Sequence, residues 1–314
     1  NLTSHYNGYY YGGISLDEGI DRIERAHVDD YSKILPMFKL ADEKTAKANY
    51  PSFDKAIQKT SLVISRHSML IKGVEYCRWI DENFMVLGKA HFYKRDYFAA
   101  LETFEYVARQ YKTKPSRFEA ILWLMKTYNA MNSVMNTPSL IALIENDKEF
   151  PKKFQTDFET LQAEYFIKTE NYKDAVKHLT KAITLTKKKK HRVRKVFILA
   201  QIYELEGNQK KASQLYAQAS KMHPTYDMLF NAKIKRAMTV QTSNETDTKM
   251  VKKELNKMLK DDKNIEFRDQ IYYALAEISL KEVDEKTAIY YLKKSALASA
   301  QNTHQRALSY LKLA

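Results

Sequence analysis

The feature that most constrains this chain is an internal repeat, which is clearest between Val193 and Thr225. The first half of this unit carries apolar or small side chains at the i, i+3, i+4, i+7 spacing of one helix face: Val196, Leu199, Ala200 and Tyr203. Gly207-Asn208 interrupts that spacing, and a second helical stripe follows: Ala212, Tyr216 and Ala219. The spacing predicts two helices joined by a short turn, with the next pair starting after Pro224.

Further copies of the same pattern cover most of the chain. They begin near Phe84, Ile121, Thr156, Tyr226 and Tyr272. The copies at Ile121 and Tyr226 are degraded, and the second of these carries a polar insertion at 242–248. A final stripe at 307–314 matches only the first helix of another unit. Because half a repeat exposes an apolar face, we expect either that this chain is part of a longer protein or that a partner covers this end.

The eight characteristic positions of the clearest unit resemble those of the tetratricopeptide repeat: Val196, Leu199, Ala200, Tyr203, Ala212, Tyr216, Ala219 and Pro224. Small residues at three of these positions allow paired helices to approach closely, and the two tyrosines fill the gaps. The expected fold class is therefore all-α, a right-handed helical solenoid of tetratricopeptide repeats with a helical N-terminal cap. Residues 76–314 would form the array of about six units plus one further helix.

Residues 1–75 do not follow the repeat and are expected to form the helical N-terminal cap region. Ile20, Ile23 and Val28 indicate a short helix, and 51–71 indicates a longer one. In the longer helix we expect Ile57, Leu62, Ile64 and Leu70 to be available for burial.

Several motifs near the N-terminus resemble a specific family. They are His5-Tyr6-Asn7-Gly8-Tyr9-Tyr10-Tyr11, Leu35-Pro36-Met37-Phe38, Asp54-Lys55-Ala56-Ile57 and Arg66-His67-Ser68-Met69, followed by 79–108. They are similar to the SprE/PorW family, tetratricopeptide-repeat outer-membrane lipoproteins of the type IX secretion and gliding-motility system of Bacteroidetes. The likeness extends over essentially the whole chain.

This resemblance implies a location in the periplasm, attached to the inner face of the outer membrane. The attachment would be a lipid anchor upstream of the residues present, because no cysteine lies near Asn1. The resemblance also implies partners among the proteins of the secretion machinery, namely the translocon and the periplasmic ring and motor components.

The net charge of +14 is concentrated in one basic run, Lys187–Lys195. The repeat register places this run in a solvated turn that lengthens one connection. We hypothesise that Lys187, Lys188, Lys189, Lys190 and Arg192 dock onto an acidic partner or an anionic surface. The alternative reading is a cytosolic repeat protein that binds RNA or an acidic partner through this basic surface.

No motif for catalysis or cofactor binding occurs. The chain lacks a phosphate-binding GxxxxGK[ST] loop, a GxGxxG turn, an HExxH pair and a GxSxG elbow. The single cysteine, Cys77, lies between Tyr76 and Trp79 and is expected to pack in the core. We therefore expect no enzyme activity, no cofactor, no metal site and no small-molecule substrate.

Binding of proteins along the inner, concave face is the better-supported activity. In this kind of repeat a defined set of first-helix positions faces that surface, and here they mix aromatic, amide and charged side chains. We predict that the partner-binding groove includes Met85, Lys89, Phe92, Tyr93, Arg194, Phe197, Gln201, Glu204, Tyr273 and Glu277. Because this set carries both signs of charge, nucleic acid is not expected to bind there.

Overall fold

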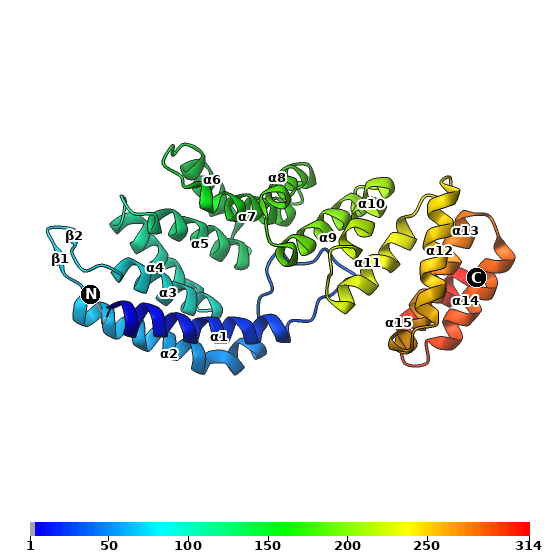
Figure 1. Cartoon of the computed structure of the whole chain (residues 1–314), viewed down its shortest axis with the longest axis horizontal. Helices are drawn as coiled ribbons and strands as arrows, with labels where there is room; N and C mark the ends of the chain where they lie inside the picture. The colour runs from blue at the N-terminus through cyan, green and yellow to red at the C-terminus, as the bar shows by residue number, and fades with distance from the viewer. Residues whose placement is uncertain (1–3) are drawn as a thin grey trace. The chain divides into compact units, whose positions relative to one another are not determined.

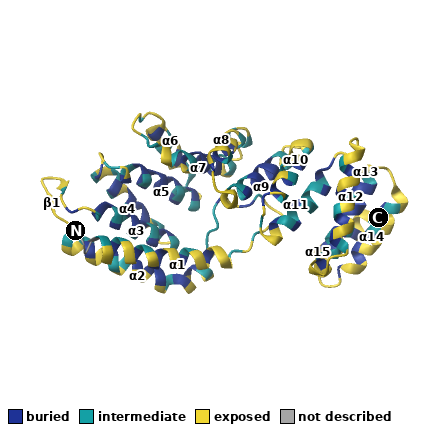
Figure 2. Ribbon diagram, in the orientation of Figure 1, coloured by how far each residue is buried: buried dark blue, intermediate teal, exposed yellow. Residues whose placement is uncertain are grey.

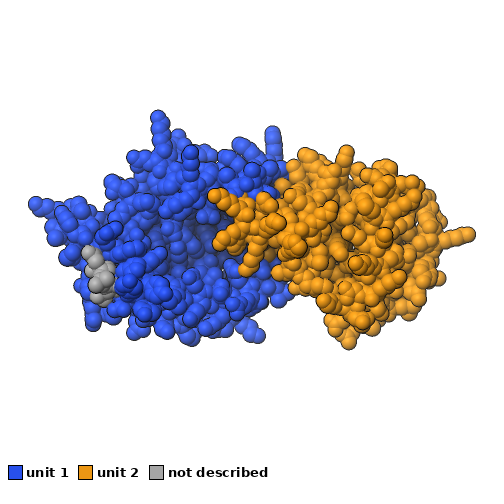
Figure 3. All heavy atoms as spheres, in the orientation of Figure 1, with its two compact units in different colours: residues 1–30, 35–185 blue, residues 31–34, 186–314 orange. Residues whose placement is uncertain are grey.

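The structure is a computed structural model that describes residues 4–314, and most of these are helical (Figure 1). The helices pack mainly on their neighbours in sequence, which makes the chain an all-α repeat solenoid. It divides into two compact units, coloured separately in Figure 3. The first unit contains the residues up to Asp30 together with Leu35–Leu185. The second contains Tyr31–Ile34 and Thr186–Ala314. No described helix is long and apolar enough to cross a membrane.

The first unit begins with a π-helical segment, Ser4–Tyr10, which continues into α1 (Tyr11–Ala26). Helix α2 (Glu43–His67) packs along α1. Its start is fixed by Asp42, whose carboxylate accepts a hydrogen bond from the Thr45 backbone N–H at 2.7 Å.

The longer helix predicted at 51–71 exists, but its bounds and its buried face differ from the expectation. It begins eight residues before Pro51, which lies inside it. Leu62 and Leu70 are exposed, so their predicted burial is wrong. Apart from Phe53, the buried stripe is built from smaller or polar residues: Ala46, Asn49, Ser52, Phe53, Ala56, Thr60 and Val63. This stripe also has helical spacing, and it places Phe53 against Gly19 of α1.

A two-stranded antiparallel hairpin separates the cap from the repeats and was not predicted. Strand β1 (Leu70–Ile71) pairs with β2 (Val74–Glu75). The two residues between the strands, Lys72 and Gly73, both have positive φ, as a tight hairpin turn of this twist requires. The strands are too short to show a period in the sequence, and their apolar side chains are exposed (Figure 2).

The first unit then contains three helix pairs in the predicted order: α3 (Ile80–Tyr93) with α4 (Tyr97–Gln110), α5 (Ser116–Ala130) with α6 (Thr137–Glu145), and α7 (Gln155–Lys168) with α8 (Tyr172–Leu185). Short 3-10 turns precede α6 and α7, at Val134–Asn136 and Lys152–Phe154.

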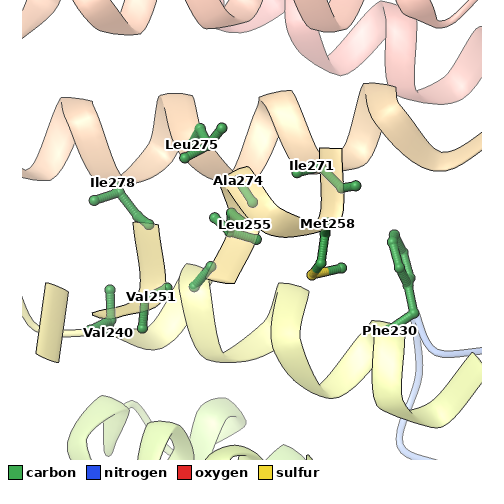
Figure 4. Close-up of a cluster of buried hydrophobic side chains, with 10 residues drawn as sticks. Phe230, Val240, Val251, Leu255, Met258, Ile271, Ala274, Leu275 and Ile278 are labelled. Carbon is green, nitrogen blue, oxygen red and sulfur yellow. The ribbon is translucent and has the colours of Figure 1, made fainter. Parts of the chain in front are cut away.

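The second unit contains three more pairs and a single helix: α9 (Lys189–Leu205) with α10 (Gln209–Ser220), α11 (Tyr226–Thr239) with α12 (Glu245–Leu259), α13 (Arg268–Lys281) with α14 (Glu285–Ala298), and α15 (Thr303–Leu313). A 3-10 segment, Asp262–Phe267, leads into α13. Figure 4 shows how α11, α12 and α13 share one apolar core, in which Leu255 and Ile271 are fully buried.

The small residues expected to allow close helix packing are where the repeat pattern placed them. The equivalent position in the second helix of four pairs is 0% exposed in every case: Ala100, Ala175, Ala212 and Ala288. At Gly88, an added Cβ would lie 2.6 Å from Cε1 of Phe104 on the paired helix. The interpretation of these positions is confirmed.

Most turns inside the pairs have the same backbone conformation, which their residue types do not indicate. In five of the six pairs one residue just after the first helix has positive φ: Arg95, Asn132, Glu170, Gly207 and Val283. The N–H of the following residue bonds back to the helix, for example Asn208 N to Tyr203 O at 2.8 Å. This is the Schellman helix ending, which glycine adopts most easily, yet only one of the five positions is glycine. The α11–α12 turn differs, because Val240 after α11 has a φ of −61°.

The basic run does not form the long turn that we expected. Lys189 begins α9, so only residues 186–188 connect it to α8. Helix α9 has 17 residues and α7 has 14. The extra length is an added helical turn, because lysine is a good helix former and an exposed first turn leaves its charge in water.

The predicted domain boundary between residues 75 and 76 concerns folding units and stays a prediction.

At the C-terminal end of the chain, α15 packs on α14 through Gln305 and Ser309, while Tyr310 is 58% exposed.

Candidate partner-binding surfaces

In the first unit, the predicted groove residues gather around two lysines. Lys89 Nζ lies 2.6 Å from Glu119 Oε1, which ties α3 to α5. Met85 and Phe92 are almost fully buried, and Tyr93 stacks on Phe53 of α2 at 6.0 Å between ring centroids. The four predicted residues do share one region, but two of them are core residues. Their role in binding partners stays a prediction.

Lys126 lies at the centre of this region and was not picked out from the sequence. Its Nζ is 4.2 Å from the ring centroid of Trp123 and 4.3 Å from that of Phe38. Phe92 and Tyr93 add rings at 5.3 and 5.5 Å. Burial lowers the pKa of Lys126 to about 8, although the nearby carboxylate of Glu164 favours the charged form. The aromatic faces add cation–π contacts to the ammonium. Phe38 comes from the connection between α1 and α2, so this cage depends on a contact that no local pattern reveals.

In the second unit, Phe197 and Gln201 of α9 lie on one face and are covered by the chain itself. Phe197 is 0% exposed and lies between Tyr31 and Tyr216, at ring-centroid distances of 5.5 and 5.2 Å. Gln201 Nε2 donates a hydrogen bond to the Lys33 carbonyl oxygen at 2.6 Å.

The neighbouring groove residues of α9 have mixed surroundings. Glu204 accepts a hydrogen bond from the Tyr216 hydroxyl at 2.5 Å and pairs with Lys235 of α11 at 3.1 Å. Burial, together with the nearby Glu204, raises the pKa of Tyr216. Arg194 is half-buried. These contacts position Glu204 within the unit, and its use by a partner stays a prediction.

The last predicted pair, Tyr273 and Glu277, lies on α13 beneath α15. Lys312 of α15 reaches Glu277 with Nζ 3.1 Å from Oε1. Burial raises the pKa of Tyr273 to about 12, and the hydrogen-bonded Glu277 adds to the effect. Both residues are half-buried.

The basic run forms an exposed cluster at the start of α9. Lys187, Lys188, Lys189 and Lys190 are all exposed, and Arg192 is half-buried. Cations at a helix N-terminus interact unfavourably with the helix dipole. The cluster therefore destabilises α9 unless a bound anion compensates for its charge.

A carboxyl pair at the start of α3 is a perturbed acidic site that the sequence did not reveal. Asp81 is almost fully buried; although burial opposes ionisation, hydrogen bonds from Glu82, Lys114 and Ser116 hold its pKa below the ordinary value. Burial and the adjacent Asp81 raise the pKa of Glu82 to about 7. Lys114 and Ser116 lead into α5, so the pair joins successive repeats.

The described residues offer little to bind a small ligand. No group of His, Cys, Asp or Glu side chains among them is arranged to hold a metal ion. Cys77 is 3% exposed and packs with Val63 and Ile80, which confirms its predicted burial. A shallow surface depression of about 470 Å³ lies on α6, lined by Ser139, Ala142, Leu143, Asn146, Asp147 and Lys148.

Comparison with known proteins gives only distant structural likenesses. No family model matches the chain, and no curated protein matches its sequence. A tetratricopeptide repeat protein from Parabacteroides merdae has 12% identity and a TM-score of 0.44, with 96% of this chain and 100% of that chain covered.

Two solved structures of Rap proteins are similarly distant. The apo form of RapI has 12% identity and a TM-score of 0.46, with coverage of 95% and 77%. A Rap protein complexed with competence and sporulation factor has 10% identity and a TM-score of 0.40, with coverage of 96% of each chain. At these values the assignment to an all-α repeat solenoid rests on the helix packing of the chain itself.

Proposed function

We propose that this chain is a non-catalytic scaffold that binds other proteins. The observation that supports it best is the regular succession of helix pairs within each unit. Their first helices, such as α3, α5 and α7, present side chains at fixed spacing, the arrangement by which helical repeats hold extended partners. Some polar side chains link one helix to another, as Lys89 does between α3 and α5 and Lys235 does between α11 and α9.

We further propose that the scaffold belongs to the type IX secretion and gliding-motility apparatus. There it would link the outer-membrane translocon to the periplasmic ring and motor, as a lipoprotein on the inner face of the outer membrane. The support is the likeness of the motifs at 5–11, 35–38, 54–57 and 66–69 to that family. The chain's own partner-binding surfaces are those described above.

Affinity purification of the full-length protein from its native envelope, after mild cross-linking, tests this proposal. We expect translocon and ring proteins to be recovered. A matched variant with Lys187–Lys190 changed to glutamate examines the basic cluster, and it should recover less of any partner that docks there. Recovery of no secretion protein with either form would refute the secretion role, and equal recovery with both would refute docking through the lysines.

The location is tested separately by metabolic labelling with a radioactive fatty acid. The full-length protein should be labelled and should fractionate with the outer membrane. Changing the acylated cysteine upstream of this segment should abolish both. An unlabelled protein in the soluble fraction would contradict the proposed anchor.

The alternative function is RNA binding, and the four exposed lysines at the start of α9 are the observation that favours it. If four phosphates were neutralised there, log K for single-stranded RNA should fall with log salt with a slope of roughly −3. A flat salt dependence, or the same slope after Lys187–Lys190 are changed to glutamate, would exclude this cluster as an RNA site.

A further inference from the structure

The hairpin of β1 and β2 exposes apolar side chains on both of its faces. Successive residues of a strand point to opposite faces, so Leu70 and Ile71 lie on different faces, yet both are exposed. Val74, which pairs with Ile71, and Tyr76, just after β2, are exposed as well. Figure 1 shows the hairpin projecting from the helices of the first unit, between α2 and α3. These four side chains, here called the hairpin tip, form an apolar projection.

The base of the hairpin is fixed to the fold, which gives the hairpin tip a defined position. The Glu75 carboxylate accepts hydrogen bonds from the backbone N–H groups of Met69 and Cys77, at 2.9 and 2.8 Å. Gln110, the last residue of α4, donates from Nε2 to the carbonyl oxygen of Gly73 at 2.7 Å. Because these bonds order the hairpin before any partner binds, docking costs little conformational entropy.

Exposed tyrosines border the hairpin tip on the side of the N-terminal segment. The ring centroid of Trp79, which follows the hairpin, lies 4.3 Å from that of His5, and Tyr6 meets the His5 ring at 4.6 Å. Tyr6 and Tyr10 are exposed, like Tyr76 of the tip itself. A tyrosine joins an apolar ring to a polar hydroxyl, and this residue type is enriched at the boundary between lipid and water.

The charge around the hairpin tip is positive. Residues 1–16 contain no Lys, Arg, Asp or Glu, and residues 66–78 contain three Lys or Arg against one Glu. That residue is Glu75, whose carboxylate binds the hairpin's own backbone. Lys72 in the turn and Arg66 near the end of α2 are exposed. An apolar projection with basic residues beside it is complementary to a bilayer that carries anionic headgroups.

We propose that the hairpin tip docks into the surface of an anionic phospholipid bilayer. A bilayer surrounds a projection and so covers both faces of the hairpin, whereas a flat protein surface covers only one. The apolar side chains reach the boundary between headgroups and acyl chains, and the long stem of Lys72 lets its ammonium return to the phosphates. This inference goes beyond the proposed scaffold function, and it does not rest on the lipid anchor because the contact belongs to the folded chain.

Sedimentation of the complete chain with phospholipid vesicles tests the proposal. Vesicles of phosphatidylcholine with about one third phosphatidylglycerol are used at about 0.5 M salt, which screens docking through Lys187–Lys190. The chain should bind. Ile71→Ser with Val74→Ser should lower its partition coefficient at least about tenfold, because these side chains are 56% and 54% exposed and lose most of their apolar surface. Leu297→Ser with Leu311→Ser, two exposed leucines of the second unit, is the matched control and should leave it unchanged.

Tryptophan quenching locates the contact on the chain. Tyr76→Trp places a reporter on the hairpin tip, and Tyr290→Trp on α14 is its matched control, since both tyrosines are exposed. Lipids brominated on their acyl chains quench a tryptophan that reaches them. Vesicle binding should therefore quench the Tyr76→Trp chain more strongly than the Tyr290→Trp chain.

The contribution of charge is measured in a chain whose Lys187–Lys190 are changed to glutamate. At about 0.1 M salt, adding Lys72→Glu should lower binding to the phosphatidylglycerol vesicles at least about fivefold. Binding to vesicles of phosphatidylcholine alone should change little, because these carry no net charge. Equal losses on both kinds of vesicle would refute recognition of anionic headgroups.

Three results would overturn the proposal: no binding to vesicles, binding unaffected by Ile71→Ser with Val74→Ser, or equal quenching at positions 76 and 290. A dimer that forms without vesicle binding and is lost on Ile71→Ser with Val74→Ser would also overturn it, since the tip would then cover a second copy of the chain. The outcome is separable from that of the proposed anchor. Vesicle binding by the unlipidated chain stands even if the full-length protein takes up no fatty acid, and labelling without vesicle binding refutes the docking tip alone.

Discussion

Replacing Gly88 with alanine should destabilise the first unit, whereas the same replacement at Gly13 should stabilise it. Both glycines lie inside helices, Gly13 in α1 and Gly88 in α3. An added Cβ at Gly88 would lie 2.6 Å from Phe104 Cε1, well inside the normal contact distance of ~3.5–4.0 Å between carbon atoms. At Gly13 an added Cβ would meet nothing within 4 Å.

The comparison isolates packing because both variants gain the same helix propensity. Alanine in place of glycine stabilises a helix interior by about 0.5–1 kcal/mol, which is the whole effect expected at Gly13. At Gly88 the extra methyl group also overpacks a filled core, which costs about 1–3 kcal/mol. Gly88→Ala should therefore be about 1–3 kcal/mol less stable than Gly13→Ala.

Tryptophan fluorescence during urea unfolding is the appropriate assay. The chain has two tryptophans, Trp79 and Trp123, and both lie in the first unit. Trp123 stacks on Phe104 at 5.7 Å, so its emission reports on the packing that Gly88→Ala disturbs. If the free energy of unfolding of Gly88→Ala equals or exceeds that of Gly13→Ala, the inference that α3 and α4 pack too closely at Gly88 to admit a methyl group is wrong.

Three further predictions concern other parts of the fold. Burial and the adjacent Asp81 raise the pKa of Glu82 to about 7 in the folded chain, above its unfolded value near 4.5. The stabilisation that protonated Glu82 contributes is therefore complete below pH 4.5 and is lost as the pH rises through 7. Glu82→Gln, which mimics the protonated form, should therefore raise the urea midpoint at pH 8 and change it little at pH 5; equal effects at both pH values would contradict this. Val283 is 81% exposed with φ of 62°, so Val283→Gly should stabilise the α13–α14 pair by about 1 kcal/mol, seen as slower amide exchange; faster exchange would refute it. Asn208→Ala removes the side chain that caps α10 through the Lys211 N–H and should cost about 1 kcal/mol, measured by exchange of α10 amides, whereas Asn208→Asp should not.

The sequence predicted the helix pairs well because their signal is local and repeated. The small residues at Ala100, Ala175 and Ala212 recur at matching places in their pairs, and each is fully buried. Pro138 marks the start of α6 in the sequence, since proline is favoured at the first positions of a helix.

The turns and the start of α9 were harder to predict, for physical reasons. Glu170 and Val283 adopt the left-handed conformation that glycine would signal, because the helix pairing fixes the turn regardless of residue type. The run of charge at residues 187–190 predicted a solvated loop. Lysine is also a good helix former, and an exposed first turn of a helix keeps these charges in water just as a loop does.

The candidate site was the least predictable part. The periodicity identified Phe197 and Gln201 as residues on one face of α9, as the structure shows. It carried no signal that a segment 168 residues earlier covers Gln201, because such a contact leaves no local pattern. The aromatic cage of Lys126, which needs Phe38, was missed for the same reason.

The measurement that tests the central claim most directly is in-cell cross-linking of the full-length protein with a photoreactive residue on its repeat helices. Exposed positions such as Lys189 on α9 and Tyr290 on α14 are suitable, since both face solvent. A protein-binding scaffold predicts position-specific cross-links to a small set of defined proteins, including components of the secretion apparatus. Cross-links dominated by RNA, or none above those of an unlabelled control at any position, would contradict the account.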